Sequence, residues 1–296
     1  YYISVPVFFL VDGYLFSRRV IHLKNYNYLE YVKNSLFRLL APWTVFTLAY
    51  TFARYAFELT GFFKERLVLG HSSQEVIISA YGSVIAPQMY FLFSLFLIRL
   101  CSPIFKNLLL IKNYFVLLLL FFCYYATYIS IIPSISPYLK IEVGQEPILH
   151  ALWGIQFYLF GVIVFRTAEI MDLKKLFVPF LSAFLAVLLI RNKFASNGLN
   201  HLIQYLYLLT LFLFFTYFQN GFSFLNIIGK NTMGIYLLHT PMVLKGVSLV
   251  LNKLVFDPLL SFISILFVTL AVSICITIAV NAVPYGCLLF GVRYKR

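Results

Sequence analysis

One histidine inside an apolar segment is the residue of this chain that is best placed to do chemistry. His239 lies near the end of the stretch from Asn226 to Val243, beside Pro241 and a run of apolar residues. An ionisable group at membrane depth is costly, so it marks a functional site by default. A neutral imidazole can take up a proton near neutral pH and act as a base. A polar contact between helices would explain the same histidine, and both roles stay open.

Three more ionisable side chains interrupt apolar runs. Asp12 lies in the first run, where a carboxylate must pair with a cation or a hydroxyl group, or take up a proton. Asp12 would either make a polar contact between helices or take part in a functional site. Arg54 and Glu58 are four residues apart and face the same way on a helix, so we expect an ion pair. We favour a structural pair, and the alternative is that the carboxylate orients a bound substrate on the outer side.

The composition identifies an integral membrane protein. Hydrophobic residues make up 62% and charged residues 11% of the 296 residues, whereas a soluble domain has about 25% charged residues. The 23 Lys and Arg residues outnumber the 10 Asp and Glu residues but form no continuous patch, so we expect no nucleic-acid partner. Four cysteines show no metal-ligand spacing, and we expect buried thiols and no metal site.

The elements that position these residues are expected to be membrane-spanning helices. Each such helix needs about 20 mostly apolar residues. The apolar runs predict an all-α, polytopic bundle of transmembrane helices with about nine spans. No loop is long enough for a separate soluble domain, so residues 1–296 are expected to form a single integral-membrane domain. The predicted spans are residues 1–17, 39–59, 86–105, 113–133, 150–166, 176–191, 201–218, 233–250 and 259–283.

The loops and the first residues suggest a topology. Lys and Arg lie mainly in alternate loops and in the C-terminal tail, which places these segments in the cytoplasm. We therefore expect a multi-pass protein of the inner (plasma) membrane, in contact with membrane lipid. The sequence begins with Tyr1 and enters an apolar run at once. We expect it to be N-terminally incomplete, with one further span upstream.

Five blocks of the sequence occur in the order of those in the membrane acyltransferase-3 family. The block Ile-Gly-Lys-x-x-x-Gly-Ile-Tyr-Leu-Leu-His-x-Pro, which ends at Pro241, resembles a late helix of that family and is the most specific. Residues 3–16 resemble its second helix, with Asp12 in place of a serine. Residues 31–43 resemble its basic segment with an Arg-x-x-x-Pro core, and the remaining blocks are residues 87–103 and 157–162.

The resemblance implies an enzyme of about ten spanning helices. Such enzymes move an acetyl or related group from a cytoplasmic coenzyme A thioester to a sugar hydroxyl group. Acyl-coenzyme A would be the donor substrate, a cell-surface or lipid-linked saccharide the acceptor, and no cofactor would be bound permanently. Cations suit the phosphates of the donor, so Arg38, Lys33, Arg18 and Arg19 are candidate donor-binding residues. Topology signalling is the favoured alternative for Lys33, Arg18 and Arg19 taken singly.

The same resemblance implies a principal base outside this sequence. The first helix of the family carries a basic residue and, about ten positions later, the histidine that is thought to act as base. Neither has a counterpart here, so we expect residues 1–296 alone not to catalyse acyl transfer. His239 would substitute only if it reached the same donor and acceptor.

Two other classes of membrane protein deal with similar saccharides. A transporter or flippase for lipid-linked saccharides would show repeat symmetry and matching broken helices in its two halves, and we find no such pair. A polysaccharide polymerase would be expected to have a larger outer loop. Both stay as alternatives to the acyltransferase.

Overall fold

The computed structural model describes the chain as a set of helices. The described residues are 4–22, 26–61, 66–82, 84–135, 146–191, 197–218, 223–254, 257–283 and 285–291. These residues form helices and short connections, and none of them lies in a strand. The all-α fold class predicted from the sequence is therefore confirmed.

The chain divides into two compact units. The first unit comprises Tyr1–Tyr31, Leu97–Lys140 and Leu149–Phe222, and the second comprises Val32–Phe96, Ile141–Ile148 and Ser223–Arg296. Three of the boundaries between the units fall within helices, namely α2 (Tyr28–Ser35), α5 (Tyr90–Leu100) and α8 (Glu146–Ile170).

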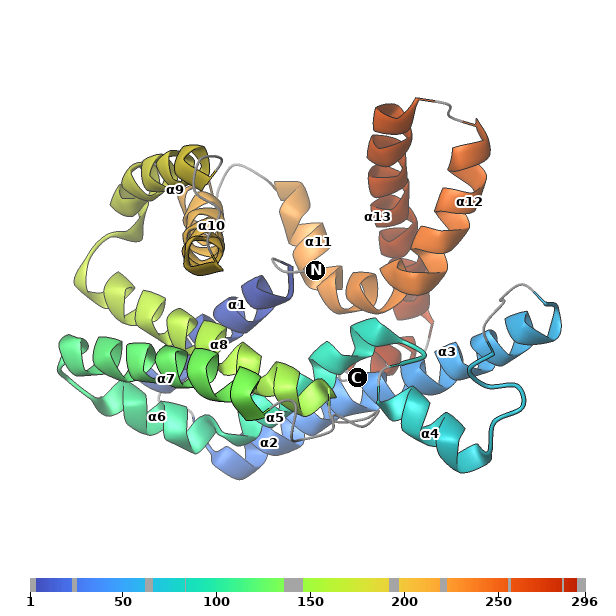
Figure 1. The fold of residues 1–296 in the computed structure, drawn as a ribbon, viewed down its shortest axis with the longest axis horizontal. Coiled ribbons are helices and arrows are strands. Elements are labelled where there is room, and N and C mark those ends of the chain that lie inside the picture. Colours follow the sequence, from blue (N-terminus) through green and yellow to red (C-terminus); the bar gives the residue numbers. More distant parts are fainter. Residues whose placement is uncertain are drawn as a thin grey trace. The chain divides into compact units, whose positions relative to one another are not determined.

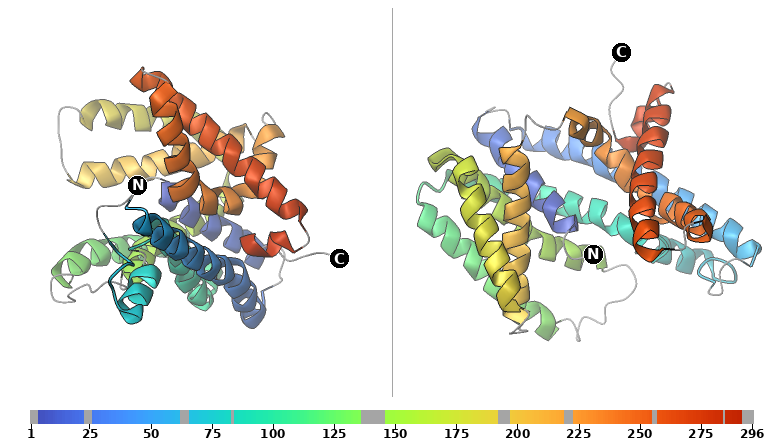
Figure 2. Two further views of the ribbon diagram at one scale, coloured as in Figure 1. Left: turned by 90° about the vertical axis from the view of Figure 1, so that its right-hand side faces the viewer. Right: turned by 90° about the horizontal axis from the view of Figure 1, so that it is seen from above.

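The first unit combines the first helix of the chain with helices from the middle of the sequence. Helices α9 and α10 lie side by side in it, and the views of Figure 1 and Figure 2 agree on this. Besides parts of α2, α5 and α8, the unit contains α1 (Ser4–Ile21), α6 (Ser102–Leu110), α7 (Tyr114–Ile135), η3 (Leu173–Leu176), α9 (Phe177–Arg191) and α10 (Asn197–Tyr217).

Helix α1 crosses α8 with direct contact between the two backbones. A Cβ atom added at Gly13 would lie 2.2 Å from the carbonyl oxygen of Tyr158, and one added at Gly161 would lie 2.1 Å from that of Leu10. Real Cβ atoms essentially never come closer than 3.0 Å to such atoms. Glycine is therefore required on both helices, in the way that small residues let spanning helices approach closely.

The second unit holds the helix that carries His239. Helices α12 and α13 lie side by side in it (Figure 1), and α11 packs against α13 where Gly234 contacts Thr277. Besides parts of α2, α5 and α8, the unit contains η1 (Leu36–Leu40), α3 (Ala41–Leu59), α4 (Ser73–Tyr81), η2 (Pro87–Met89), α11 (Ser223–Leu238), η4 (His239–Val243), α12 (Leu244–Leu254), α13 (Pro258–Ala282) and η5 (Gly286–Phe290).

Several helices are long and apolar enough to cross a membrane. In the described residues there are four: Tyr28–Leu59, Tyr114–Ile131, Pro147–Ile170 and Pro258–Ala282. The number rises to five if α5 and α6, which are bent by 54° relative to each other, form one broken span. These helices identify a multi-pass membrane protein, and the number of about nine spans stays a prediction.

Helix α13 shows the polarity expected of a helix in lipid. Leu259, Phe262 and Phe267 are 69%, 66% and 63% exposed, whereas Ser273 and Thr277 are buried. This is the reverse of a helix at the surface of a soluble protein, where the apolar face is the buried one. The exposed apolar face is suited to acyl chains, and the small hydroxyl side chains face protein.

The structure differs from the predicted spans where helices break. The predicted span 233–250 is divided between α11 and α12 by η4, and the predicted span 86–105 is divided by the bend at Cys101. Proline follows each break closely, and its missing N–H interrupts helical hydrogen bonding. The predicted span 39–59 is the later part of a continuous helix that begins at Tyr28.

The crossing of α1 and α8 can be tested by adding one methyl group. We expect Gly161→Ala to lower the free energy of unfolding by about 1–3 kcal/mol, because the added atom overpacks a backbone contact. The measurement is the unfolding transition of the purified protein in detergent. Gly246→Ala is the matched control, since nothing lies within 4 Å of an added Cβ atom there. Equal stability of the two variants would contradict the close crossing.

Candidate functional site

Helix α11 ends where Pro241 removes a backbone donor. In an uninterrupted α-helix the carbonyl group of Leu237 would accept a hydrogen bond from residue 241, but proline has no N–H. Thr240 leaves the helical conformation, with φ −129° and ψ 138°, as the steric demands of a following proline favour. The break therefore leaves the carbonyl groups of Leu237 and Thr240 in need of donors from other segments.

Side chains from two other segments supply these donors. The buried hydroxyl group of Tyr50, on α3, donates to the carbonyl oxygen of Leu237 and lies 3.1 Å from that of Thr240. The amide Nε2 of Gln88 donates to the carbonyl oxygen of Thr240 at 2.7 Å. The hydroxyl group of Tyr236 donates in turn to the backbone carbonyl oxygen of Gln88. The broken helix is thus held by a network of polar groups.

His239 lies at this break with one ring nitrogen already engaged. Its Nδ1 atom is 3.0 Å from the carbonyl oxygen of Ile235 and 2.8 Å from that of Tyr236. Both neighbours are acceptors, so Nδ1 must carry the hydrogen. In the neutral ring, Nε2 then keeps a lone pair. The half-buried imidazole is therefore in the tautomer that lets Nε2 act as a proton acceptor.

Lys33 and Arg38 lie on the first part of the long helix that includes α3. Lys33 is in the last turn of α2, Arg38 is in the π-helical turn η1, and both are exposed. Pro42 explains the wide turn, because its missing N–H leaves the carbonyl group of Arg38 without its α-helical donor. The N–H of Ala41 instead bonds to the carbonyl oxygen of Leu36, five residues back. Such π turns are frequent at functional sites.

The end of the described chain packs against this turn. Gly291 has a φ of +67°, and a Cβ atom added to it would lie 2.5 Å from the carbonyl oxygen of Arg38. Nearby, the ring of Phe290 stacks on that of Phe46, with 6.1 Å between the ring centroids. The π turn that carries Arg38 is therefore backed by the segment that follows α13.

Arg54 and Glu58 form the ion pair expected from their spacing. The Nε atom of Arg54 is 2.7 Å from Oε1 of Glu58, whose side chain is fully buried. The same carboxylate accepts hydrogen bonds from the N–H groups of Leu67, Val68 and Leu69, at 2.8, 3.1 and 2.8 Å. Each carboxylate oxygen thus accepts two hydrogen bonds. Glu58 fixes the loop after α3, which supports the structural interpretation of this pair.

Asp12 finds its partner in the same unit. It forms a bidentate ion pair with Arg99 of α5, in which Nε of Arg99 lies 3.0 Å from Oδ2 and Nη2 contacts Oδ1. Both side chains are largely buried, at 14% exposure for Asp12 and 16% for Arg99. The Arg99 guanidinium group also lies 5.8 Å from the centre of the Tyr31 ring. A polar contact between helices therefore accounts for Asp12.

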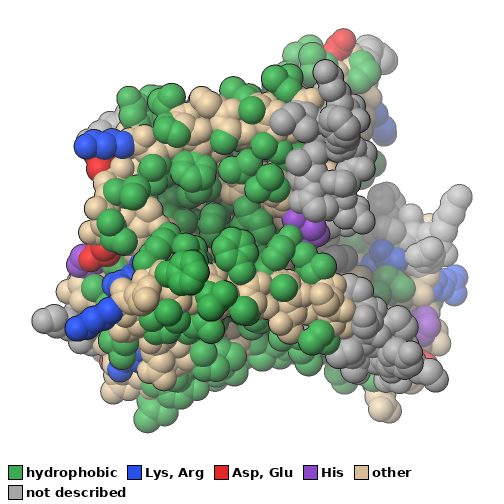
Figure 3. Space-filling model, turned by 60° about the vertical axis from the view of Figure 1, so that its left-hand side comes forward, with side chains coloured by type: hydrophobic (Ala, Val, Ile, Leu, Met, Phe, Trp, Pro, Cys, Tyr) green, Lys and Arg blue, Asp and Glu red, His purple; other side chains and the backbone are tan. Residues whose placement is uncertain are grey.

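Cations collect at one edge of the first unit. Arg18 and Arg19 are exposed in the last turn of α1, and the guanidinium group of Arg19 lies 5.8 Å from the centre of the Tyr31 ring. Lys106 lies 5.2 Å from the centre of the Tyr26 ring. Burial raises the pKa of the Tyr26 hydroxyl group above its ordinary value, so this ring stays neutral. Figure 3 shows charged side chains along one edge of a face that is otherwise largely hydrophobic.

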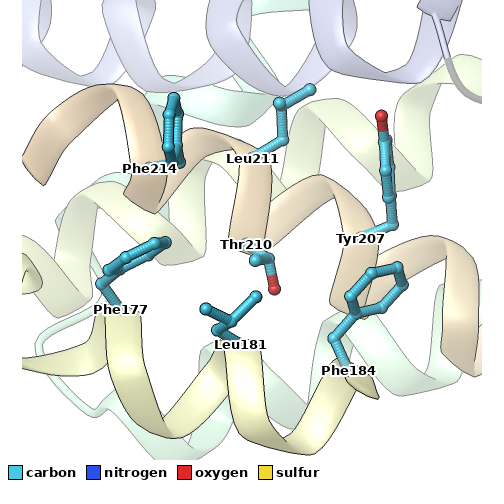
Figure 4. A pocket seen from close by; sticks show the side chains of 7 residues that line it. All are labelled: Phe177, Leu181, Phe184, Tyr207, Thr210, Leu211 and Phe214. Carbon is cyan, nitrogen blue, oxygen red and sulfur yellow. The ribbon is translucent and has the colours of Figure 1, made fainter. Parts of the chain in front are cut away.

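The cavity between α9 and α10 is apolar. It has a volume of about 360 Å³, and Phe177, Leu181 and Phe184 of α9 face residues of α10 across it (Figure 4). Among the described side chains that line it, none is acidic, basic or a thiol, and Tyr207 and Thr210 supply the only hydroxyl groups. This cavity suits an apolar chain. Among the described residues, no group of three His, Cys, Asp or Glu side chains could hold a metal ion.

Three residues of these networks were missed by the sequence interpretation. Tyr50 stands four residues before Arg54 and eight before Glu58, so it shares their helix face, and this spacing was the available signal. Arg99, the partner of Asp12, lies within a predicted span. Its charge was the available signal, because a cation within a span needs an anion such as Asp12 as its partner. Gln88 gave no signal of its own, because its role depends on a break in a distant helix.

Comparison with known proteins gives one match. The model of a family described as an acyltransferase domain matches residues 1–278. Neither the curated proteins nor the solved structures compared with the chain gave a match.

The support of the broken helix by Tyr50 can be tested by removing one oxygen atom. We expect Tyr50→Phe to lower the free energy of unfolding by about 1–3 kcal/mol, because the buried carbonyl group of Leu237 loses its donor. Thermal unfolding in detergent would measure this loss. Tyr55→Phe on the same helix is the control, since Tyr55 is 41% exposed. A Tyr50→Phe variant as stable as the control would show that the hydroxyl group does not hold the break.

Proposed function

Because the chain belongs to the acyltransferase family whose model it matches, we propose that it transfers an acyl group, such as acetyl, from coenzyme A to a saccharide. The acceptor atom is a hydroxyl oxygen of a cell-surface or lipid-linked sugar. Acyl-coenzyme A is bound as a substrate for each turnover. The protein acts in the inner membrane, with its C-terminus and the segment around Arg38 on the cytoplasmic side.

The observation that carries this proposal is the geometry of His239, to which we assign the role of base in place of the histidine that the family resemblance places upstream of this sequence. Its Nδ1–H is committed to two carbonyl oxygens, so Nε2 is the nitrogen that meets the acceptor. Nε2 takes the proton of the sugar hydroxyl group as its oxygen attacks the thioester carbonyl carbon. The tetrahedral intermediate then collapses, the carbon–sulfur bond breaks, and the thiolate receives the proton from the imidazolium ring. The two carbonyl oxygens at Nδ1 stabilise the imidazolium form between these steps.

The donor requires cations for its phosphate groups. In the second unit we assign this role to Arg38, with Lys33 as a further contact, because both are exposed on the helix that leads to Tyr50. In the first unit, Arg18 and Arg19 are exposed cations of the same kind. A guanidinium group forms two parallel hydrogen bonds to a phosphate, whereas an ammonium group acts as a point charge.

Family membership favours this enzyme over the transporter or flippase. A transporter would move the saccharide without breaking a covalent bond, and it would need neither a base nor a thioester donor. Turnover of labelled acyl-coenzyme A by the full-length protein separates the two classes directly.

The role of His239 can be tested by substitution. In the full-length protein, we expect His239→Gln to lower kcat/KM for acyl transfer by about 10²–10⁴-fold, the usual effect of losing a general base. Transfer of a radiolabelled acetyl group to a saccharide acceptor in liposomes would measure it. The control is His201→Gln, which makes the same substitution at another histidine. A substitution of Gln88 would not serve as a control, because Gln88 holds the break. A His239→Gln variant with the activity of the control would remove His239 from the mechanism.

The role of Arg38 can be tested by donor binding. We expect Arg38→Ala to weaken binding of coenzyme A about 10- to 100-fold, because a charge-assisted hydrogen bond to phosphate is lost. Arg38→Lys should recover part of this affinity. Lys253→Ala, which removes an exposed cation at the end of α12, is the control. Unchanged affinity in both Arg38 variants would contradict the assignment.

A further inference from the structure

The buried face of α3 is polar, although the helix is apolar as a whole. Trp43, Thr47, Tyr50 and Arg54 follow one another at spacings of four, three and four residues, so they lie along one side. Thr47 and Tyr50 are only 1% and 3% exposed. On the opposite side, Phe52 is 74% exposed. In a spanning helix, polar groups that face the protein interior, while the apolar side faces lipid, mark a candidate functional site.

Two polar atoms on this face have no partner among the described residues. They are Nε1 of Trp43 and Oγ1 of Thr47, and both are buried. Two other threonines of the same helix bond within it, since Thr44 donates to Leu40 at 2.9 Å and Thr51 donates to Thr47 at 2.8 Å. Buried polar atoms are nearly always hydrogen-bonded, so an unpaired one calls for a partner such as an ordered water molecule or a bound ligand.

These two atoms lie between the proposed donor-binding residue and the broken helix. Arg38 precedes Tyr50 by twelve residues, which is roughly 18 Å along a helix. Trp43 and Thr47 occupy the middle of this distance. The Tyr50 hydroxyl group contacts the carbonyl groups beside His239. A ligand with phosphates at Arg38 and a reactive end at the break would therefore pass both unpaired atoms.

The pantetheine arm of coenzyme A has the length and the chemistry for this path. It joins the diphosphate to the sulfur through about twelve bonds and so spans roughly 15 Å when extended. It carries two amide groups and a hydroxyl group. Trp43 Nε1 is a donor, and a threonine hydroxyl group is both donor and acceptor, so the pair can bond to amides of either orientation.

We propose that the Trp43–Thr47 face of α3 binds the pantetheine arm of the donor. Trp43 Nε1–H donates to an amide carbonyl oxygen of the arm, and the Thr47 hydroxyl group bonds to an amide. The rings of Tyr81 and Phe93, with centroids 5.0 and 4.9 Å from that of Trp43, keep the indole in place. This inference rests on the proposed function, because it takes coenzyme A as the donor, and it adds the route by which the thioester reaches His239.

The test compares two ligands that differ only in the arm. Binding of coenzyme A and of 3′-phosphoadenosine 5′-diphosphate, which lacks the arm, is measured by calorimetry on the full-length protein. Thr47→Val keeps the shape of the side chain and removes the hydroxyl group. We expect it to weaken binding of coenzyme A about 3- to 10-fold, the usual effect of one lost hydrogen bond, and to leave binding of the armless nucleotide unchanged. Trp43→Phe should have the same selective effect.

Thr51→Val is the matched control, because the Thr51 hydroxyl group is bonded within its own helix. It should leave binding of both ligands unchanged. Wild-type affinity for coenzyme A in both Thr47→Val and Trp43→Phe would overturn this inference and leave the proposed function intact. Equal weakening of both ligands would overturn it as well, since the effect would then not concern the arm. A wild-type protein that binds neither ligand would overturn the proposed function itself.

Discussion

The structure of the second unit depends on one constraint. Backbone carbonyl groups that lose their helical hydrogen-bond donor to a proline need a new partner. A bilayer offers no water to replace a missing helical hydrogen bond, so each freed carbonyl group must be met by protein. Pro241 frees the carbonyl group of Leu237, and Tyr50 supplies the donor from α3. Pro42 has the corresponding effect on Arg38, where the helix widens into a π turn and Gly291 packs against the carbonyl group. His239, to which we assign the base, and Arg38, to which we assign phosphate binding, therefore both lie where a proline disturbs helical hydrogen bonding.

The distribution of polar and apolar side chains on the helices also indicates that lipid surrounds them. Helices α3 and α13 expose large apolar side chains and bury hydroxyl groups, as helices do when lipid surrounds them. In the first unit the ion pair of Asp12 and Arg99 keeps two charges largely buried. Cations with aromatic neighbours lie in the last turn of α1 and in the middle of α6, and tyrosine rings together with basic side chains suit a membrane interface.

The sequence predicted the fold class and much of the helix pattern, because long apolar runs such as those of α7 and α13 permit little else in a membrane. The pair of Arg54 and Glu58 was predictable as well, since helical spacing alone brings the two together. The break at His239 was not predicted, although Pro241 was noticed, because composition alone does not distinguish a kink from a straight span. Tyr50, Gln88 and Arg99 were missed because their partners are 87 to 190 residues away, and no local pattern encodes such distances.

The crossing of Gly13 and Gly161 also has a consequence for biogenesis. During translation α1 leaves the ribosome long before α8 exists, so the glycine surface against which it will pack is not yet available. Asp12 must likewise enter the bilayer before Arg99, which is synthesised 87 residues later. Helix α1 can therefore reach its final packing only after α5 and α8 have been synthesised.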